Sequence, residues 1–243
     1  MRLRPRPTFR AATSARFRDF YQAAECVRAI SQSHLYPANT RLLDAGEALI
    51  NGAGDGTHSI LVLTFESADR SQEANLQRAL EIVRANAGEY DERVSNTEGA
   101  QRQGAAGQWR DSFLRMPYYR EVLTPRGIIA DTFESAITWD RFPDFHARVK
   151  AETERAIEEV TGKKGLVTCR FTHVYPDGPA PYYTFVAPSR HGALRHHQVE
   201  IRHTRSARIG VRRRRGGDLP RHRGAGRLGA RRDDRRRRSE DRA

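Results

Sequence analysis

Apolar and polar positions recur with two different periods in the first part of the chain, and their order predicts the elements. In residues 17–31, apolar side chains recur every three to four positions, as on one face of a helix. The run SILVLTFESA at 59–68 is almost continuously apolar and rich in β-branched residues, which is typical of a buried strand. Further strands are expected at residues 1–10, 39–44 and 89–93, and a second helix at 68–88. The resulting βαββαβ order is the ferredoxin-like pattern.

The second half of the chain repeats part of this order. Residues 95–107 lack periodicity and are expected to form a linker. A helix at 108–124, a strand at 127–139, a helix capped by Asp140 and two strands around the turn Pro176-Asp177-Gly178 follow. The predicted fold class is therefore α+β. We expect a duplicated ferredoxin-like domain over residues 1–190, with a mostly antiparallel sheet and helices on one face, followed by a disordered Arg-rich tail.

The last two expected strands contain adjacent tyrosines whose roles depend on the strand register. If Val174 pairs with Tyr182, then Tyr183 and Phe185 join the apolar face of the hairpin. Tyr182 then lies on the opposite face, which is also the face of Arg170. A shift of one residue would exchange the two tyrosines, and the sequence leaves this alternative open.

The positive charge of the chain is concentrated at its C-terminal end. The net charge is +13, but residues 201–243 contain 17 arginines against 5 acidic residues. The remaining residues are nearly neutral, with 26 basic and 25 acidic side chains. The body of the chain therefore lacks the broad basic surface that a nucleic-acid backbone requires, and nucleic acid is not an expected partner.

The tail at 191–243 allows three interpretations. From residue 201 onward it contains no Phe, Trp or Tyr, so it offers little to a hydrophobic core. It could be a solvated linker, an Arg/Gly arm that binds nucleic acid, or an out-of-frame translation. The chain contains 40 arginines and 3 lysines, as a GC-rich gene would give, and the change of composition is abrupt. The sequence favours the change of reading frame.

Composition also limits the compartment and the chemistry. The chain has two cysteines, Cys26 and Cys169, which gives no disulfide framework and favours a reducing compartment. It contains neither a run of 18 apolar residues nor a signal peptide, so we expect a cytoplasmic location, with a membrane surface as an alternative. The nine histidines lack the spacing of metal ligands, and no metal is expected. The loop NGAGDGTH at 51–58 lacks the features of a phosphate-binding loop.

Four stretches resemble one known family. They are RLLD at 41–44, PYYREVL at 117–123, DTFESAITWD at 131–140 and CRFTHVYPDGPAPYYTF at 169–185. The family is the FAD-linked oxidases, in the branch of alkyldihydroxyacetonephosphate synthase, and the resemblance is to its C-terminal cap domain. It covers about residues 1–190, and the chain departs from the family pattern after APSRHGAL at 187–194. The resemblance implies a duplicated ferredoxin-like cap.

The resemblance also implies a reaction and the residues that perform it. The family exchanges the acyl group of acyl-dihydroxyacetone phosphate for a fatty alcohol through a flavin N5 adduct. Tyr182 falls at the catalytic tyrosine of the family, and Arg120 and Arg41 fall at its substrate-binding arginines. The cofactor is FAD, bound mainly by a domain that we expect to be absent from this chain and to act as its partner. A homodimer is a further expectation.

Elementary chemistry agrees with these residue types, and two other functions stay open. A phenol can donate or accept a proton, and a guanidinium matches the oxygens of a phosphate or carboxylate. An FAD-linked 2-hydroxy-acid dehydrogenase, of the D-lactate or glycolate type, would need the same groups. A non-catalytic ferredoxin-like module with an RNA-binding tail is the alternative from a different class. Taken alone, the chain is expected to be incomplete and inactive.

Overall fold

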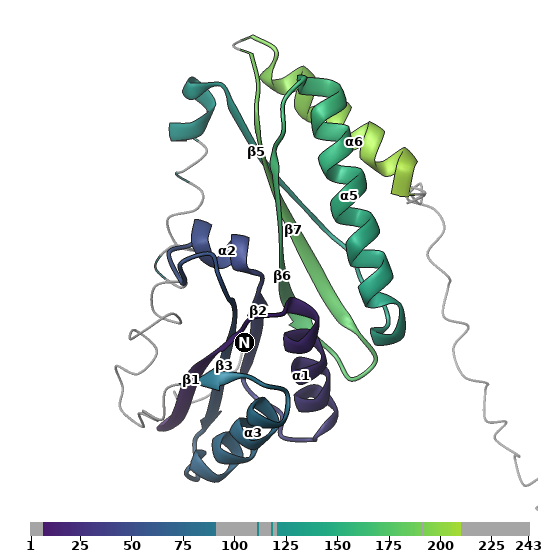
Figure 1. The fold of residues 1–243 in the computed structure, drawn as a ribbon. Helices are drawn as coiled ribbons and strands as arrows, with labels where there is room; N and C mark the ends of the chain where they lie inside the picture. The colour runs from purple at the N-terminus through teal and green to yellow at the C-terminus, as the bar shows by residue number, and fades with distance from the viewer. Residues whose placement is uncertain (1–6, 91–110, 112–117, 119–120, 191, 210–243) are drawn as a thin grey trace, which may run out of the picture. The chain divides into compact units, whose positions relative to one another are not determined.

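The computed structural model describes residues 7–90, 111, 118, 121–190 and 192–209, whose arrangement Figure 1 shows. Side chains are described as far as residue 206. The linker expected at 95–107 and most of the helix expected at 108–124, including Arg120, lie outside the described residues. The part of the expected tail beyond residue 209 lies outside them as well.

The first repeat has the predicted βαββαβ order and one additional short helix. Its elements are β1 (Phe9–Phe17), α1 (Phe20–Gln32), β2 (Asn39–Leu43), α2 (Ala45–Ile50), β3 (Ser59–Ser67), α3 (Glu73–Ala85) and β4 (Glu89–Tyr90). The strand expected at residues 1–10 instead begins at Phe9 and ends at Phe17, because its whole length pairs with β3. Helix α1 begins after Asp19, whose carboxylate accepts a hydrogen bond from the main-chain N–H of Gln22 at 2.8 Å.

The second repeat has a strand, a long helix, a hairpin and a final helix. Its elements are η2 (Thr124–Arg126), β5 (Ile128–Glu134), η3 (Trp139–Arg141), α5 (Phe142–Thr161), β6 (Leu166–Val174), β7 (Pro179–Pro188) and α6 (Leu194–Ile209). The strand expected to reach residue 139 ends at Glu134. Asp140 does not cap α5, because it lies in the 3₁₀ turn that precedes this helix, and Arg141 occupies the cap position.

The seven strands of the described residues form one antiparallel sheet in the order β4-β1-β3-β2-β6-β7-β5. The order β4-β1-β3-β2 is that of a ferredoxin-like unit, and β5, β6 and β7 correspond to β1, β2 and β3. The repeats meet at β2 and β6, which share the single paired position Leu43 with Arg170. The predicted duplication and antiparallel sheet are therefore confirmed, and Figure 1 shows the two halves of the sheet side by side.

The main core lies between the sheet and four helices on one of its faces. In the first repeat, Leu42, Leu61 and Leu63 belong to a buried cluster with residues of α1 and α3. In the second repeat, Tyr183 and Phe185 belong to a cluster with residues of α5 and α6. This arrangement confirms the prediction that helices cover one face. The exception is α2, which was not predicted.

Helix α2 covers part of the opposite face of the sheet. Its Ala48 packs in a small cluster with Leu43, Ile60 and Val62, the side chains that alternate with those of the main core. We call this side of the sheet the α2 face. It includes every residue directly paired with Leu43 or Val62, because opposite residues of an antiparallel pair point to the same side.

Helix α6 packs onto the second repeat, although residues 191–243 were expected to form a disordered tail. Ile201 is fully buried in the core cluster of α5 and β7. Arg202 forms a two-pronged ion pair with Asp131 of β5, and the Arg205 guanidinium lies 3.5 Å from the centre of the Phe133 ring. Since α6 follows β7 as α3 follows β3, it completes the second repeat, and the folded domain extends past the boundary expected at residue 190.

The longest described helix, α5, has the composition of a helix that lies on a sheet. Its buried residues include Val149, Ala156 and Ile157 on one side, and charged residues occupy the other side. Gly162 ends the helix in a left-handed conformation with a φ of 69°. Neither α5 nor any other helix in the described part of the chain is long and apolar enough to cross a membrane.

Candidate functional site

The hairpin of β6 and β7 decides the roles of the two adjacent tyrosines. Tyr182 pairs with Arg170 and Tyr183 with Cys169, so the expected pairing of Val174 with Tyr182 is wrong. Val174 pairs instead with Pro179, because the strands continue to within a few residues of the turn. The predicted faces of the two tyrosines nevertheless hold, because Arg170, the actual partner of Tyr182, lies four residues from the expected partner Val174, which is an even number.

Two local features set this register. Thr172 is the extra residue of a β-bulge between Phe171 and His173, so that beyond it His173 is exposed and Val174 packs against the main core. Gly178 lies so close to the segment between β5 and η3 that a Cβ there would be 1.9 Å from the main-chain oxygen of Ile137. The turn therefore requires glycine at this position.

Tyr183 is a core residue of the helix-covered face. It is fully buried, and its hydroxyl lies 3.3 Å from Nδ1 of the buried His146. Burial raises the pKa of Tyr183 far above its usual range, and burial together with Lys150 lowers the pKa of His146 to about 4. Both side chains are therefore neutral near pH 7, as a structural pair in a core should be.

Tyr182 lies on the α2 face together with Arg170. The Arg170 guanidinium carbon is 4.0 Å from the centre of the Tyr182 ring, the geometry of a cation–π contact. Arg170 is only 3% exposed, whereas Tyr182 is half-buried. None of the described residues forms a hydrogen bond with Nε of Arg170. The buried Arg170 guanidinium therefore packs against the Tyr182 ring, and its Nε–H has no acceptor among the described residues.

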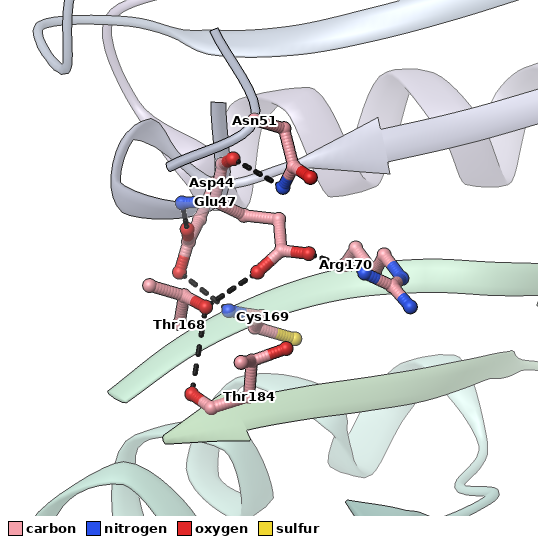
Figure 2. Close-up of polar contacts among 7 residues, drawn as sticks. All are labelled: Asp44, Glu47, Asn51, Thr168, Cys169, Arg170 and Thr184. Atoms are coloured by element: carbon pink, nitrogen blue, oxygen red, sulfur yellow. Dashed lines mark hydrogen bonds and ion pairs between the residues drawn. The ribbon is translucent and has the colours of Figure 1, made fainter. Parts of the chain in front are cut away.

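A buried carboxylate on α2 holds Arg170 in place (Figure 2). Glu47, 1% exposed, accepts a hydrogen bond from Nη1 of Arg170 at 2.5 Å through Oε1. Its Oε2 accepts a hydrogen bond from the Thr168 hydroxyl at 2.5 Å. Both carboxylate oxygens are thus engaged by β6, and this contact joins the two repeats beside their single paired position.

A second carboxylate fixes the start of α2 against the same strand. Oδ1 of Asp44 accepts a hydrogen bond from the main-chain N–H of Glu47 at 2.7 Å, which caps the helix. Its Oδ2 accepts one from the main-chain N–H of Cys169 at 2.8 Å, and Figure 2 shows both contacts. Burial raises the pKa of Asp44 to about 6 despite these two bonds.

Arg41 of β2 lies on the α2 face as well, because Arg41 pairs with Val62. It is half-buried, and its Nε donates a hydrogen bond to Oδ1 of Asn39 at 3.1 Å. Burial and the nearby Arg170 lower the pKa of Arg41. This face therefore contains two arginines close enough to repel one another, and Glu47 compensates the charge of one of them.

The structure thus brings two of the three sequence-predicted site residues, Tyr182 and Arg41, to one face of the sheet. The third, Arg120, lies outside the described residues. Sequence reasoning missed Asp44 and Glu47. The signal for them is present, because DAGE at 44–47 has the Asp-x-x-Glu spacing of a helix N-terminal capping box.

The described residues can be compared with what FAD would require. Its diphosphate is usually held by a glycine-rich turn between a strand and a helix N-terminus. The glycine-rich loop at 51–58 instead connects α2 to β3, so it does not have that form. The α2 face, with a phenol and guanidinium groups, fits the reacting side of a flavin and an anionic substrate. The residues therefore fit a role opposite the cofactor rather than around its diphosphate.

Two solved structures of alkyldihydroxyacetonephosphate synthase have folds similar to this chain. One superposes with a TM-score of 0.67 at 15% sequence identity, over 84% of this chain and 39% of that chain. The other superposes with a TM-score of 0.61 at 15% identity, over 84% of this chain and 41% of that chain. The chain thus spans about two-fifths of the length of these structures. At this identity the likeness shows the fold.

The family assignment comes from the sequence match of the domain itself. The family described as FAD linked oxidases, C-terminal domain, matches residues 6–207. The match begins just before β1 and ends within α6, so it continues beyond the departure expected after residue 194. This chain belongs to the FAD-linked oxidase family, of which it contains the C-terminal domain.

Proposed function

We propose that this domain forms the substrate side of a flavin-dependent enzyme that acts on an anionic substrate. The specific reaction that we propose is the exchange of the acyl group of acyl-dihydroxyacetone phosphate for a fatty alcohol. The observation that supports it best is the placement of Tyr182 and Arg41 on one face of the sheet, opposite the helix-covered core. Neither side chain belongs to the main core, so the packing of that core does not explain their placement.

The chemistry of the α2 face suits an anion. The Arg41 guanidinium on this face can bind phosphate or carboxylate oxygens. None of the described residues hydrogen-bonds the hydroxyl of the half-buried Tyr182. Tyr182 can therefore transfer a proton to or from a substrate oxygen that Arg41 helps to orient. In this proposal Arg120 supplies a second guanidinium.

FAD, when bound, would supply reversible acceptance of an electron pair next to the substrate. We propose that a separate domain holds most of this cofactor, because the described residues fit its reacting side and not its diphosphate. The α2 face would then exclude water from the substrate, hold its anionic group with Arg41 and exchange a proton through Tyr182.

The test is to join this chain to the FAD-binding domain of an alkyldihydroxyacetonephosphate synthase and to supply acyl-dihydroxyacetone phosphate with a labelled fatty alcohol. We expect label in the ether product, and Arg41→Lys should raise KM about tenfold or more, because an ammonium cannot reproduce a two-pronged contact. Arg16→Lys, at an exposed position on β1, is the matched control and should leave KM unchanged.

Two results would contradict this proposal. Reduction of a dye by D-lactate or glycolate, without incorporation of the alcohol, would assign the domain to a 2-hydroxy-acid dehydrogenase. An unchanged KM for Arg41→Lys would remove Arg41 from the substrate site.

A further inference from the structure

We propose that Arg170 and Glu47 are positioning residues that hold the ring of Tyr182 in its working orientation. This inference rests on the proposed function, in which Tyr182 transfers the proton. It adds two residues that lie behind the tyrosine and touch no substrate. The first reason is the contact itself, with the Arg170 guanidinium 4.0 Å from the ring centre and buried beneath it.

The second reason is that Arg170 has little freedom to move. Its Nη1 donates to Oε1 of Glu47, and the other oxygen of that carboxylate is occupied by Thr168. Glu47 in turn lies on the first turn of α2, which Asp44 caps and attaches to β6. The orientation of the guanidinium is therefore determined by main-chain contacts on both repeats.

The third reason is that the arrangement is poorly optimised for stability alone. A buried ion pair is often no more stabilising than an apolar pair of the same volume. Nε of Arg170 has no hydrogen-bond partner among the described residues, which adds a desolvation cost. Features that lower stability in this way tend to be found at functional sites. Here the buried pair keeps a flat cation against Tyr182, the tyrosine of β7 that faces away from the main core.

The consequence concerns the ring of Tyr182. A tyrosine on a strand can adopt more than one χ1 rotamer. The cation favours the rotamer that lays the ring over the guanidinium, and so places the hydroxyl at one point of the α2 face. A proton-transfer group must be placed to within a fraction of an ångström, and a misplacement of about 1 Å can cost about a hundredfold in rate.

The experiment uses the chain itself, labelled uniformly with 3-fluorotyrosine, and ¹⁹F NMR. Tyr182→Phe identifies the Tyr182 resonance by its loss. In Arg170→Gln and in Glu47→Gln we expect this resonance to shift and broaden, because the ring is released. The resonance of Tyr183 should stay in place, which shows that the core is intact.

Two further variants keep the test decisive. Arg10→Gln is the matched control, since Arg10 pairs with Glu66 at 3.4 Å on the same face of the sheet and is also largely buried. This control should leave the Tyr182 resonance unchanged. Arg170→Lys retains the charge beside Glu47 but not the flat guanidinium. If the glutamine variants do not fold, Arg170→Lys alone should still shift the Tyr182 resonance.

A kinetic arm, in the chain joined to the FAD-binding domain, separates this inference from the proposed function. Arg170→Lys should lower kcat by about tenfold to a hundredfold and leave KM nearly unchanged. An unchanged Tyr182 resonance in every Arg170 and Glu47 variant would overturn the positioning role, even if Tyr182→Phe abolishes turnover. If the resonance shifts but Tyr182→Phe retains full turnover, Arg170 still positions the ring and the proposed function of Tyr182 is wrong.

Discussion

Removal of the Glu47 carboxylate should destabilise this domain more than the loss of any exposed ion pair. In Glu47→Ala, the Arg170 guanidinium stays 3% exposed and loses its acidic partner, and the Thr168 hydroxyl loses its acceptor. Breaking a buried pair by removing one member costs about 3–5 kcal/mol. Since domains of this kind have a total stability of about 5–15 kcal/mol, the loss should be visible in a single urea titration.

The double variant Glu47→Met with Arg170→Met tests whether the unpaired charge of Arg170 causes this loss of stability. Replacing both charges with apolar side chains of similar size should restore most of the lost free energy of unfolding, because no unpaired charge is then buried. The control is Glu81→Ala, which removes an exposed ion pair with Arg78 on α3 and should change the stability by at most about 0.5 kcal/mol. A loss below about 1 kcal/mol in Glu47→Ala would refute the reasoning, because Arg170 would then be solvated.

Two further predictions concern the second repeat. Ile201→Ala should lower the free energy of unfolding by about 2–5 kcal/mol, because the side chain is fully buried in the cluster with α5. A loss smaller than about 0.5 kcal/mol would mean that α6 does not pack onto this cluster. The pKa of His146 is lowered to about 4 in the folded chain. Below about pH 6.5, the unfolded chain therefore binds a proton that the folded chain does not bind. The free energy of unfolding should fall as the pH decreases from about 6.5 to 4. His146→Gln should remove this part of the slope in urea titrations at several pH values, and an unchanged slope would contradict the assignment. Asp44, with a pKa of about 6, contributes with the opposite sign between about pH 4 and 6, so the comparison with the variant is the informative one.

Much of the fold follows from hydrophobic periodicity. The first repeat was predictable because its helices are long enough to show an apolar stripe and β3 is almost continuously apolar. Helix α2 was missed because six residues are too few to establish a period. Its N-terminal Asp-x-x-Glu pattern was the only local signal.

Helix α6 was missed for a different reason. Its sequence LRHHQVEIRHTRSARI is dominated by basic residues, and few of its positions are strongly apolar. It packs through Ile201 and through two arginines. Arg202 forms an ion pair with Asp131, and Arg205 lies over an aromatic ring. Such contacts depend on residues about seventy positions away, which a local pattern does not reveal. The basic composition therefore suggested a tail where the structure has a helix.

The sequence predicted the face of the sheet on which each of these residues lies, but not the residues that it contacts. Alternation along the strands placed Tyr182 and Arg170 on one side and Tyr183 on the other, which requires only the parity of the register. The actual register depends on the bulge at Thr172 and on the tight turn at Gly178. The alternation of polar and apolar residues predicts neither feature. The ion pair of Arg170 joins residues 123 positions apart, and only the assembled sheet brings them together.

The central claim is that Tyr182 transfers a proton on the α2 face, while its neighbour Tyr183 serves the core. The most direct test compares two conservative variants in the chain joined to an FAD-binding domain. Tyr182→Phe should lower kcat by about 10²–10⁴-fold with little change in KM, the range for loss of a general acid or base. Tyr183→Phe, at the buried position beside His146, should leave kcat nearly unchanged. Loss of turnover in Tyr183→Phe, with full turnover in Tyr182→Phe, would contradict the account.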